Sequence, residues 1–170
     1  GCKMASLTIR PAALADAADL GIIHYQSWLQ TYTGLIDQNF LNQLSAQRSQ
    51  QRFEVEGCKQ FLIALVDGSP AGFCRYCKSR DPDADSLTGE IQAIYLLKEY
   101  QQRGIGTALM LYAFDELKKL GMNRVTLWAL ESNTTAHCFY IKMGFIPDGA
   151  RKQDPVGAEI RFSLAFSDLG

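Results

Sequence analysis

The stretch over residues 89–121 limits the possible fold of this chain more than any other. It begins with the apolar run GEIQAIYLL, which predicts a buried strand. A helix is predicted from about Gly104 to Leu120, because apolar residues recur there on one face. Two glycines, Gly104 and Gly106, lie where this helix begins. A strand, a glycine loop and a helix in this order predict an α/β unit whose helix packs against a sheet.

Comparable patterns predict the other elements of the chain. Strands are expected at residues 7–10, 61–66, 71–78, 124–130, 144–149 and 158–166. Helices are expected at about 16–32, at 38–56 with a break near Ser45, and at 134–143. The segment ARKQDPVG is expected to be a mobile loop that joins the last two strands. These elements predict a mixed α/β fold in a single domain over residues 1–170.

Charge and composition argue against several classes of protein. The net charge is −1, whereas a nucleic-acid-binding protein usually has a basic excess. No apolar run approaches the ~20 residues that span a bilayer, and the first residues do not resemble a secretory signal.

The five cysteines are scattered and odd in number, which favours free thiols in a reducing compartment. Cys74 and Cys77 lack a second pair, so a zinc site is not expected. We therefore expect a cytoplasmic protein.

The start of the helix at Gly104 is suited to an anion, because the first N–H groups of a helix have no partner within it. A Walker phosphate loop is excluded, since no Gly-Lys pair follows. A dinucleotide-binding fingerprint would need a small residue where Leu109 stands. It would also need its first glycine directly after the strand, and residues 98–103 intervene.

The run from Gln101 to Gly106 matches the pattern [QR]-x-x-G-x-[GA], the pyrophosphate loop of the GCN5-related N-acetyltransferase (GNAT) superfamily. The later segment NTTAHCFYIKMGF resembles the superfamily's N-x-x-A-x-x-[FL]-Y-x-x-x-G-F. The resemblance is specific over about residues 88–147. It implies a GNAT fold, with a mixed, mostly antiparallel sheet of about seven strands, two splayed parallel strands at its centre, and about four flanking helices.

The same resemblance implies that acetyl-CoA binds between the strands at 89–97 and 124–130. The pyrophosphate would bind the backbone at Gly104 and its neighbours, and pantetheine would pair with the backbone near Leu96. The amide near Ile94 would polarise the thioester carbonyl. Asn133 would hold the pantetheine arm or cap a helix, and Arg103 would add a charge or remain solvated. The residues implied at acetyl-CoA are Ile94, Tyr95, Leu96, Gln101, Gln102, Arg103, Gly104, Ile105, Gly106, Thr107, Asn133 and Tyr140. No metal is expected.

Acetyl transfer to an amine needs a proton acceptor for the amine and a proton donor for the leaving thiolate. Tyr140 stands at the superfamily's general-acid position, although a tyrosine there could serve packing alone. Glu90 stands where one branch carries its general base, and many relatives use water chains or other carboxylates instead. His24 and His137 are weaker candidates.

The acceptor site is the least defined part of the sequence. Trp28 and Tyr32 lie one helical turn apart and either line the acceptor cleft or pack in the core. An acidic loop at 81–85 either attracts a cationic amine or is merely solvated. The expected function is acetyl transfer from acetyl-CoA to a primary amine of a small molecule in a ternary complex. Transfer to a protein N-terminus or lysine, and a non-catalytic acyl-CoA sensing role, stay open. A homodimer is one expectation, and nucleic acid and membrane are not expected partners.

Overall fold

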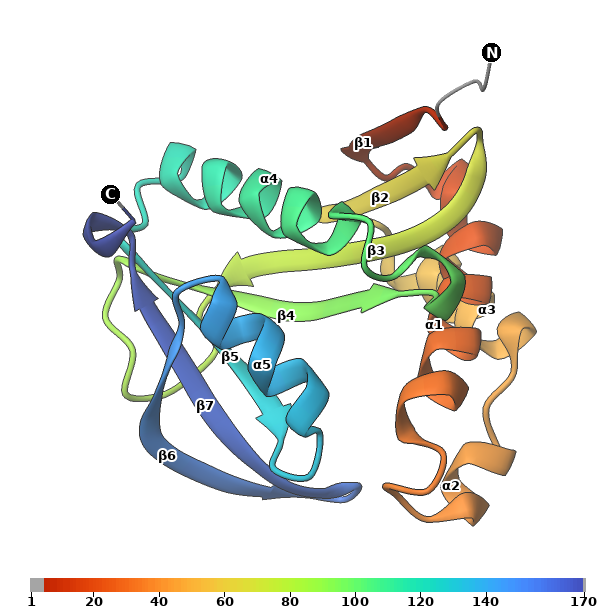
Figure 1. Ribbon diagram of the computed structural model, residues 1–170. Coiled ribbons are helices and arrows are strands. Elements are labelled where there is room, and N and C mark those ends of the chain that lie inside the picture. Colours follow the sequence, from red (N-terminus) through yellow and green to blue (C-terminus); the bar gives the residue numbers. More distant parts are fainter. Residues whose placement is uncertain (1–4, 170) are drawn as a thin grey trace.

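All strands of the protein join one sheet in the computed structural model, which describes residues 5–169 (Figure 1). The strand order is β1-β2-β3-β4-β5-β7-β6, and every neighbouring pair is antiparallel except β4 and β5. This confirms the expected seven-stranded, mostly antiparallel sheet with a central parallel pair. The strands are β1 Leu7–Pro11, β2 Phe61–Val66, β3 Ser69–Lys78, β4 Thr88–Leu96, β5 Arg124–Leu130, β6 Ile146–Asp154 and β7 Gly157–Ala165.

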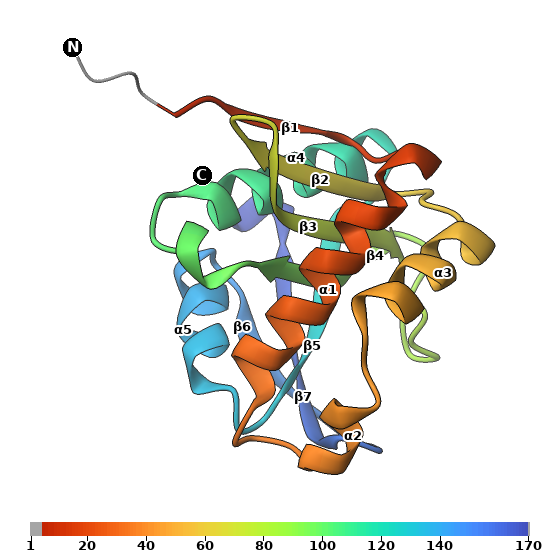
Figure 2. The ribbon, with the colours of Figure 1, turned by 90° about the vertical axis from the view of Figure 1, so that its right-hand side faces the viewer.

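The helices cover the two faces of the sheet. They are α1 Ala17–Tyr32, α2 Gln38–Asn42, α3 Ala46–Glu56, α4 Ile105–Lys119 and α5 Thr134–Lys142. Figure 2 shows α1 and α3 in front of β3 and β4, with α4 behind them. The expected break near Ser45 is confirmed, since its Oγ accepts a hydrogen bond from the Arg48 N–H (3.0 Å) and caps α3.

The core has one cluster on each face of the sheet. Leu62 and Ala64 of β2 belong to the cluster beneath α4, whereas Phe61 and Ile63 belong to the cluster beneath α1. Neighbouring residues of a strand point to opposite faces, so β2 is covered on both sides. This explains why its sequence is a continuous apolar run rather than an alternating one.

The two central strands separate soon after they begin. β4 and β5 pair only over Thr88–Glu90 and Arg124–Thr126, while β4 stays paired with β3 as far as Leu96. Beyond residue 90, the edge of β4 that faces β5 therefore has no strand partner, and Figure 1 shows the two strands diverging.

A bulge in β4 follows the point of separation. Ile91 pairs with Tyr76 and Ala93 pairs with Arg75, so Gln92 is the extra residue. Gln92, Ala93 and Tyr95 consequently all face the helices α1 and α3, where they line one cavity.

The segment ARKQDPVG is not the expected loop, because most of it continues β6 to Asp154 before a short turn. Its long polar side chains lack a hydrophobic pattern, but the structure gives them partners. Arg151 pairs with Glu131 (2.8 Å), and the Lys152 Nζ lies 4.2 Å from the centre of the Trp128 ring.

The described cysteines, Cys58, Cys74, Cys77 and Cys138, are all free, while Cys2 lies outside the described residues. Within residues 5–169, no three or more His, Cys, Asp and Glu side chains are grouped so that they could hold a metal ion. In the same range, no helix combines the length and the apolar character that crossing a membrane requires.

Candidate active site

The start of α4 lies just beyond the end of β4 and exposes backbone N–H groups. The first hydrogen bond of the helix runs from the Ala108 N–H to the Gly104 carbonyl (3.0 Å). The N–H groups of Ile105, Gly106 and Thr107 precede that bond and have no partner within the helix. Gly104 has φ +81°, a left-handed conformation, and a Cβ there would meet nothing within 4 Å. The loop is thus built with a glycine that faces open space.

The residues before Gly104 hold the loop against β4. The Gln101 Nε2 donates a hydrogen bond to the Leu96 carbonyl (3.3 Å), and Gln102 has a positive φ of 62°. The exposed guanidinium of Arg103 lies 5.6 Å from the centre of the Tyr100 ring. Gly106 faces α5, because a Cβ added at this position would lie 3.4 Å from the Cζ of Phe139.

The end of β5 is joined to α5 by two polar contacts. The Asn133 Oδ1 accepts a hydrogen bond from the Ala136 N–H (3.3 Å), so the expected capping role of Asn133 is present. The His137 Nε2 lies 2.9 Å from the Leu130 carbonyl oxygen. Because a carbonyl only accepts, this nitrogen donates, and His137 has a structural role that ties α5 to β5.

Tyr140 projects from α5 into the group formed by Phe139, Phe145 and Phe162, with ring centres 5.7, 6.2 and 5.7 Å away. Burial raises the pKa of the Tyr140 phenol above its usual value of 10.0, and Tyr32 adds to the effect. The phenol therefore carries its proton at neutral pH.

Glu90 is only 2% exposed and lies on β4 where the central strands still pair. Its Oε1 accepts hydrogen bonds from the Arg80 N–H (3.1 Å) and Nε (3.2 Å), and its Oε2 accepts one from the Arg80 guanidinium (2.7 Å). A carboxylate has about four lone-pair sites, so three of them are occupied. The carboxylate is therefore covered by Arg80, which is a setting that sequence reasoning did not include.

Glu159 is a second carboxylate, close enough to Glu90 for their charges to interact, and sequence reasoning missed it. It is half-buried on β7 and makes no ion pair with any residue in the described part of the chain. Burial raises its pKa above the usual 4.5, Lys152 opposes the shift, and Glu90 contributes to it. Glu159 also adds to the raised pKa of Tyr32, which burial mainly causes. The only sequence signal was alternation in AEIRF, which puts Glu159 and Arg161 on one face.

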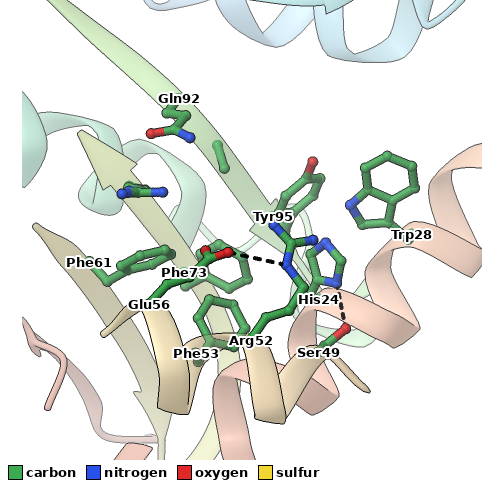
Figure 3. A pocket seen from close by; sticks show the side chains of 12 residues that line it. His24, Trp28, Ser49, Arg52, Phe53, Glu56, Phe61, Phe73, Gln92 and Tyr95 are labelled. Carbon is green, nitrogen blue, oxygen red and sulfur yellow. Dashed lines mark hydrogen bonds and ion pairs between the residues drawn. The ribbon is translucent and has the colours of Figure 1, made fainter. Parts of the chain in front are cut away.

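Trp28 and Tyr32 of α1 form an aromatic cluster with Phe40 and Tyr95. Trp28 lies 4.5 Å from Tyr32, 5.9 Å from Phe40 and 6.3 Å from Tyr95, measured between ring centres. Trp28 lines a cavity of about 260 Å³ between α1, α3 and the sheet, whereas Tyr32 lies outside this lining (Figure 3). The two candidate acceptor residues are thus in contact, and one of them lines the cavity.

His24 also lines the cavity, and its Nδ1 lies 2.8 Å from the Ser49 Oγ (Figure 3). Burial, followed by the charge of Arg52, lowers the pKa of His24 to about 4. The imidazole is therefore neutral at pH 7 but is too weak a base to remove a proton from an ammonium group.

The acidic loop between β3 and β4 has structural partners. Arg161 of β7 binds Asp83 (2.8 Å) and Asp81 (3.2 Å), and the Trp128 Nε1 donates to Asp81 (3.0 Å). Asp85 accepts a hydrogen bond from the Thr88 hydroxyl (2.8 Å). These bonds fix the loop to the sheet, and so the loop is not the freely solvated acidic patch that its sequence permits.

Comparisons with known proteins agree with this geometry. A sequence model described as Acetyltransferase (GNAT) family matches residues 24–145. The chain is 31% identical over 128 residues to an uncharacterized N-acetyltransferase, YuaI, of Bacillus subtilis, covering 75% of this chain and 73% of that protein. It is 26% identical to a spermidine N(1)-acetyltransferase of Thermoplasma acidophilum, covering 82% and 88%. The fold matches the crystal structure of the PaiA N-acetyltransferase of Thermoplasma acidophilum in complex with coenzyme A, with TM-score 0.70, 24% identity, and 92% and 98% of the two chains covered.

Proposed function

Because the chain belongs to the acetyltransferase (GNAT) family, we propose that it transfers an acetyl group from acetyl-CoA to the primary amine of a small molecule, by direct attack in a ternary complex. One observation carries the proposal. The strand β4 loses its partner β5 after residue 90, and the glycine loop with its unpaired N–H groups follows at the end of the same strand. An unpaired strand edge and a helix N-terminus suit an extended molecule that ends in phosphates.

The pieces of acetyl-CoA are assigned to the chain as follows. The pyrophosphate binds the backbone N–H groups of residues 102–107, and the pantetheine arm lies along β4 at Tyr95 and Leu96, near Asn133. The Ile94 amide donates to the thioester carbonyl and stabilises the oxyanion that forms there. Support for the phosphate position comes from Gly104, whose missing side chain leaves the front of the loop open.

The chemistry requires that the amine nitrogen bonds to the acetyl carbon while the carbon–sulfur bond breaks. The sulfur takes the phenolic proton of Tyr140, and a carboxylate accepts the proton that the amine loses. Glu90 is our first candidate for this carboxylate and acts through water, because Arg80 covers it. Glu159 is the alternative, supported by its raised pKa and by the absence of an ion pair within residues 5–169.

A small acceptor is favoured by the size of the cavity beside β4. Its volume of about 260 Å³ is below the ~300–1,000 Å³ of typical whole-ligand sites, so it suits part of a small molecule. One relative is named for its action on spermidine, which is also a small amine. Transfer to a protein N-terminus or lysine, and acyl-CoA sensing without catalysis, are the alternatives that the experiment must separate.

The proposal is tested by acetyl-CoA binding and by thiol release. We expect acetyl-CoA to raise the melting temperature, since a ligand of the folded state stabilises it by about 2.7 kcal/mol at 100 times its Kd. Small primary amines should release CoA thiol in its presence. An unchanged melting temperature at millimolar acetyl-CoA, with no heat of binding in calorimetry, would refute the proposal.

Two glycine variants locate the phosphate. Gly104→Val puts a side chain in front of the loop and should weaken acetyl-CoA binding. Gly121→Val is the matched control, because Gly121 also has a positive φ (+88°) and open space, but at the other end of α4. Both variants carry similar backbone strain, so weaker binding in Gly104→Val alone supports the assignment. Equal binding in the two variants contradicts it. Binding without thiol release from any amine or peptide would favour the sensing alternative.

A further inference from the structure

The cavity beside β4 is aromatic on the inside and charged at one side (Figure 3). Phe73 and Tyr95 of the sheet form its base, while His24 and Trp28 of α1 and Phe53 of α3 form its walls. The ring centres of His24 lie 5.6 Å from Trp28 and 6.0 Å from Tyr95, so these walls are packed and pre-formed. A group that enters this space meets aromatic rings together with the polar side chains of Arg52, Arg75 and Gln92.

One charged group in the lining has no counter-charge. Arg52 lies 3.8 Å from Glu56, and His24 is neutral at pH 7 because its pKa is about 4. Arg75 makes neither an ion pair nor a side-chain hydrogen bond with any residue from 5 to 169, and its Nε is fully buried. A buried donor without an acceptor costs free energy. An anion that enters the cavity would bind the terminal N–H groups of this guanidinium, since only its Nε is sealed from solvent.

The guanidinium of Arg75 is also held in place. It lies 4.9 Å from the centre of the Phe61 ring, a cation–π contact that fixes its plane. Arg75 is paired with Ala93 across β3 and β4, directly beside Ile94. Residues opposite each other on neighbouring strands have Cβ atoms about 5 Å apart. An anion on Arg75 therefore shares one cavity with Ala93 and Tyr95, the two neighbours of Ile94 on β4.

We propose that the acceptor is an amino acid, whose carboxylate binds Arg75 and whose side chain enters the aromatic cavity while its amine faces the thioester at Ile94. This inference rests on the proposed function and names its substrate class. A planar guanidinium with parallel donors matches a carboxylate in a bidentate manner. A polyamine fits less well, because its second cation would approach the unpaired positive charge of Arg75. The cavity volume of about 260 Å³ suits one apolar amino-acid side chain.

The test compares acceptors that differ only in the carboxylate. L-leucine and L-phenylalanine are compared with L-leucinamide and L-phenylalaninamide, and spermidine is added as a polyamine. The readout is kcat/KM from CoA thiol release at saturating acetyl-CoA. We expect each acid to exceed its amide by about 10- to 100-fold, the range of a hydrogen-bonded ion pair.

Variants separate the role of Arg75 from intrinsic differences between acids and amides. Arg75→Gln should abolish the preference for the acid, and Arg75→Lys should keep only part of it, because lysine has the charge without the planar fork. The control is Arg48→Gln, an exposed arginine of α3 outside the cavity, which should keep the wild-type ratio. If Arg75→Gln does not fold, the ratio in Arg75→Lys decides.

The outcomes distinguish this inference from the proposed function. Equal or better use of the amides or of spermidine by the wild type overturns the amino-acid acceptor and leaves the acetyltransferase assignment intact. An unchanged acid-to-amide ratio in both Arg75 variants also overturns it. Binding of acetyl-CoA without acetylation of any amino acid has the same effect. A chain that does not bind acetyl-CoA at all refutes the proposed function itself.

Discussion

Tyr140 and Glu159 both have a raised pKa, and burial is the main cause in each case. The consequences differ, because a phenol then holds its proton more firmly while a carboxylate becomes a stronger base. At the residue scale, Tyr140 is therefore protonated at neutral pH, and Glu159 accepts a proton more readily than a carboxylate of ordinary pKa. Glu90 differs from both, since Arg80 occupies most of its acceptor sites.

Replacing Tyr140 by Phe should lower kcat by about 10²–10⁴-fold, the usual contribution of a general acid. Acetyl-CoA affinity should stay within a few-fold of wild type, because the ring still packs against Phe139, Phe145 and Phe162. Thiol release gives kcat, and calorimetry gives the affinity. Tyr25→Phe on α1 is the control and should keep full activity. Full activity in Tyr140→Phe would assign Tyr140 to packing alone.

The two carboxylates are separated by the pH dependence of the rate. Activity should rise with pH as the base loses its proton. Because the pKa of Glu159 is raised, the rising limb of the pH–rate profile should lie above pH 4.5, the usual pKa of a glutamate, if Glu159 is the base. If Glu159 is the base, Glu159→Gln removes this limb and Glu90→Gln keeps it, and the reverse result identifies Glu90. Profiles of kcat/KM against pH for the three proteins decide the question. A wild-type profile in both variants would leave neither carboxylate as the base.

At the scale of elements, the loop between β3 and β4 is fixed by one arginine from a distant strand. The side chain of Arg161 is 15% exposed and binds Asp81, Asp83 and Asp148. Its pKa is raised, first by the hydrogen bond with Asp83. The same loop carries Arg80, which covers Glu90, and so its position matters for the site.

Arg161→Gln should therefore lower the free energy of unfolding by about 3 kcal/mol, because it leaves partly buried carboxylates without a partner. Arg151→Gln is a matched control on β6, since its pair with Glu131 has side chains 59% and 46% exposed. Such exposed pairs contribute about 0–1 kcal/mol. Urea unfolding measures both values. Similar losses in the two variants would show that the Arg161 pairs do not anchor the loop.

At the scale of the whole molecule, the sheet is interrupted at its centre and acetyl-CoA is proposed to fill the gap. Binding should slow amide hydrogen exchange in residues 91–96 and 102–107, where β4 lacks a partner and the helix N-terminus is open. Residues 61–66 of β2 are the internal reference and should not change at short exchange times. Mass spectrometry of peptides measures both regions. Slowing elsewhere but not in these two segments would contradict the assigned position.

Much of the structure at the proposed acetyl-CoA site could be predicted from the sequence, because its loop and helix start depend on local rules. A left-handed residue before a helix favours a glycine, and Gly104 has φ +81° at this position. The strand before it, the helix after it and the cap at Ser45 are each determined by residues within a few positions. Resemblance to the superfamily then supplied the parallel strands, which local patterns cannot give because pairing involves distant segments.

The acceptor side was decided only by the tertiary structure. Glu90 is covered by Arg80, Glu159 comes from β7, and Arg75 lines a cavity that α1 and α3 form over the sheet. The part of β6 over residues 150–154 likewise depends on distant segments of the chain, because its polar side chains contact residues outside β6. Burial and charge pairing arise between segments that are far apart in the chain. The local sequence determines the loop and helix start that are proposed to bind acetyl-CoA, whereas long-range packing determines the surroundings of the proposed acceptor site.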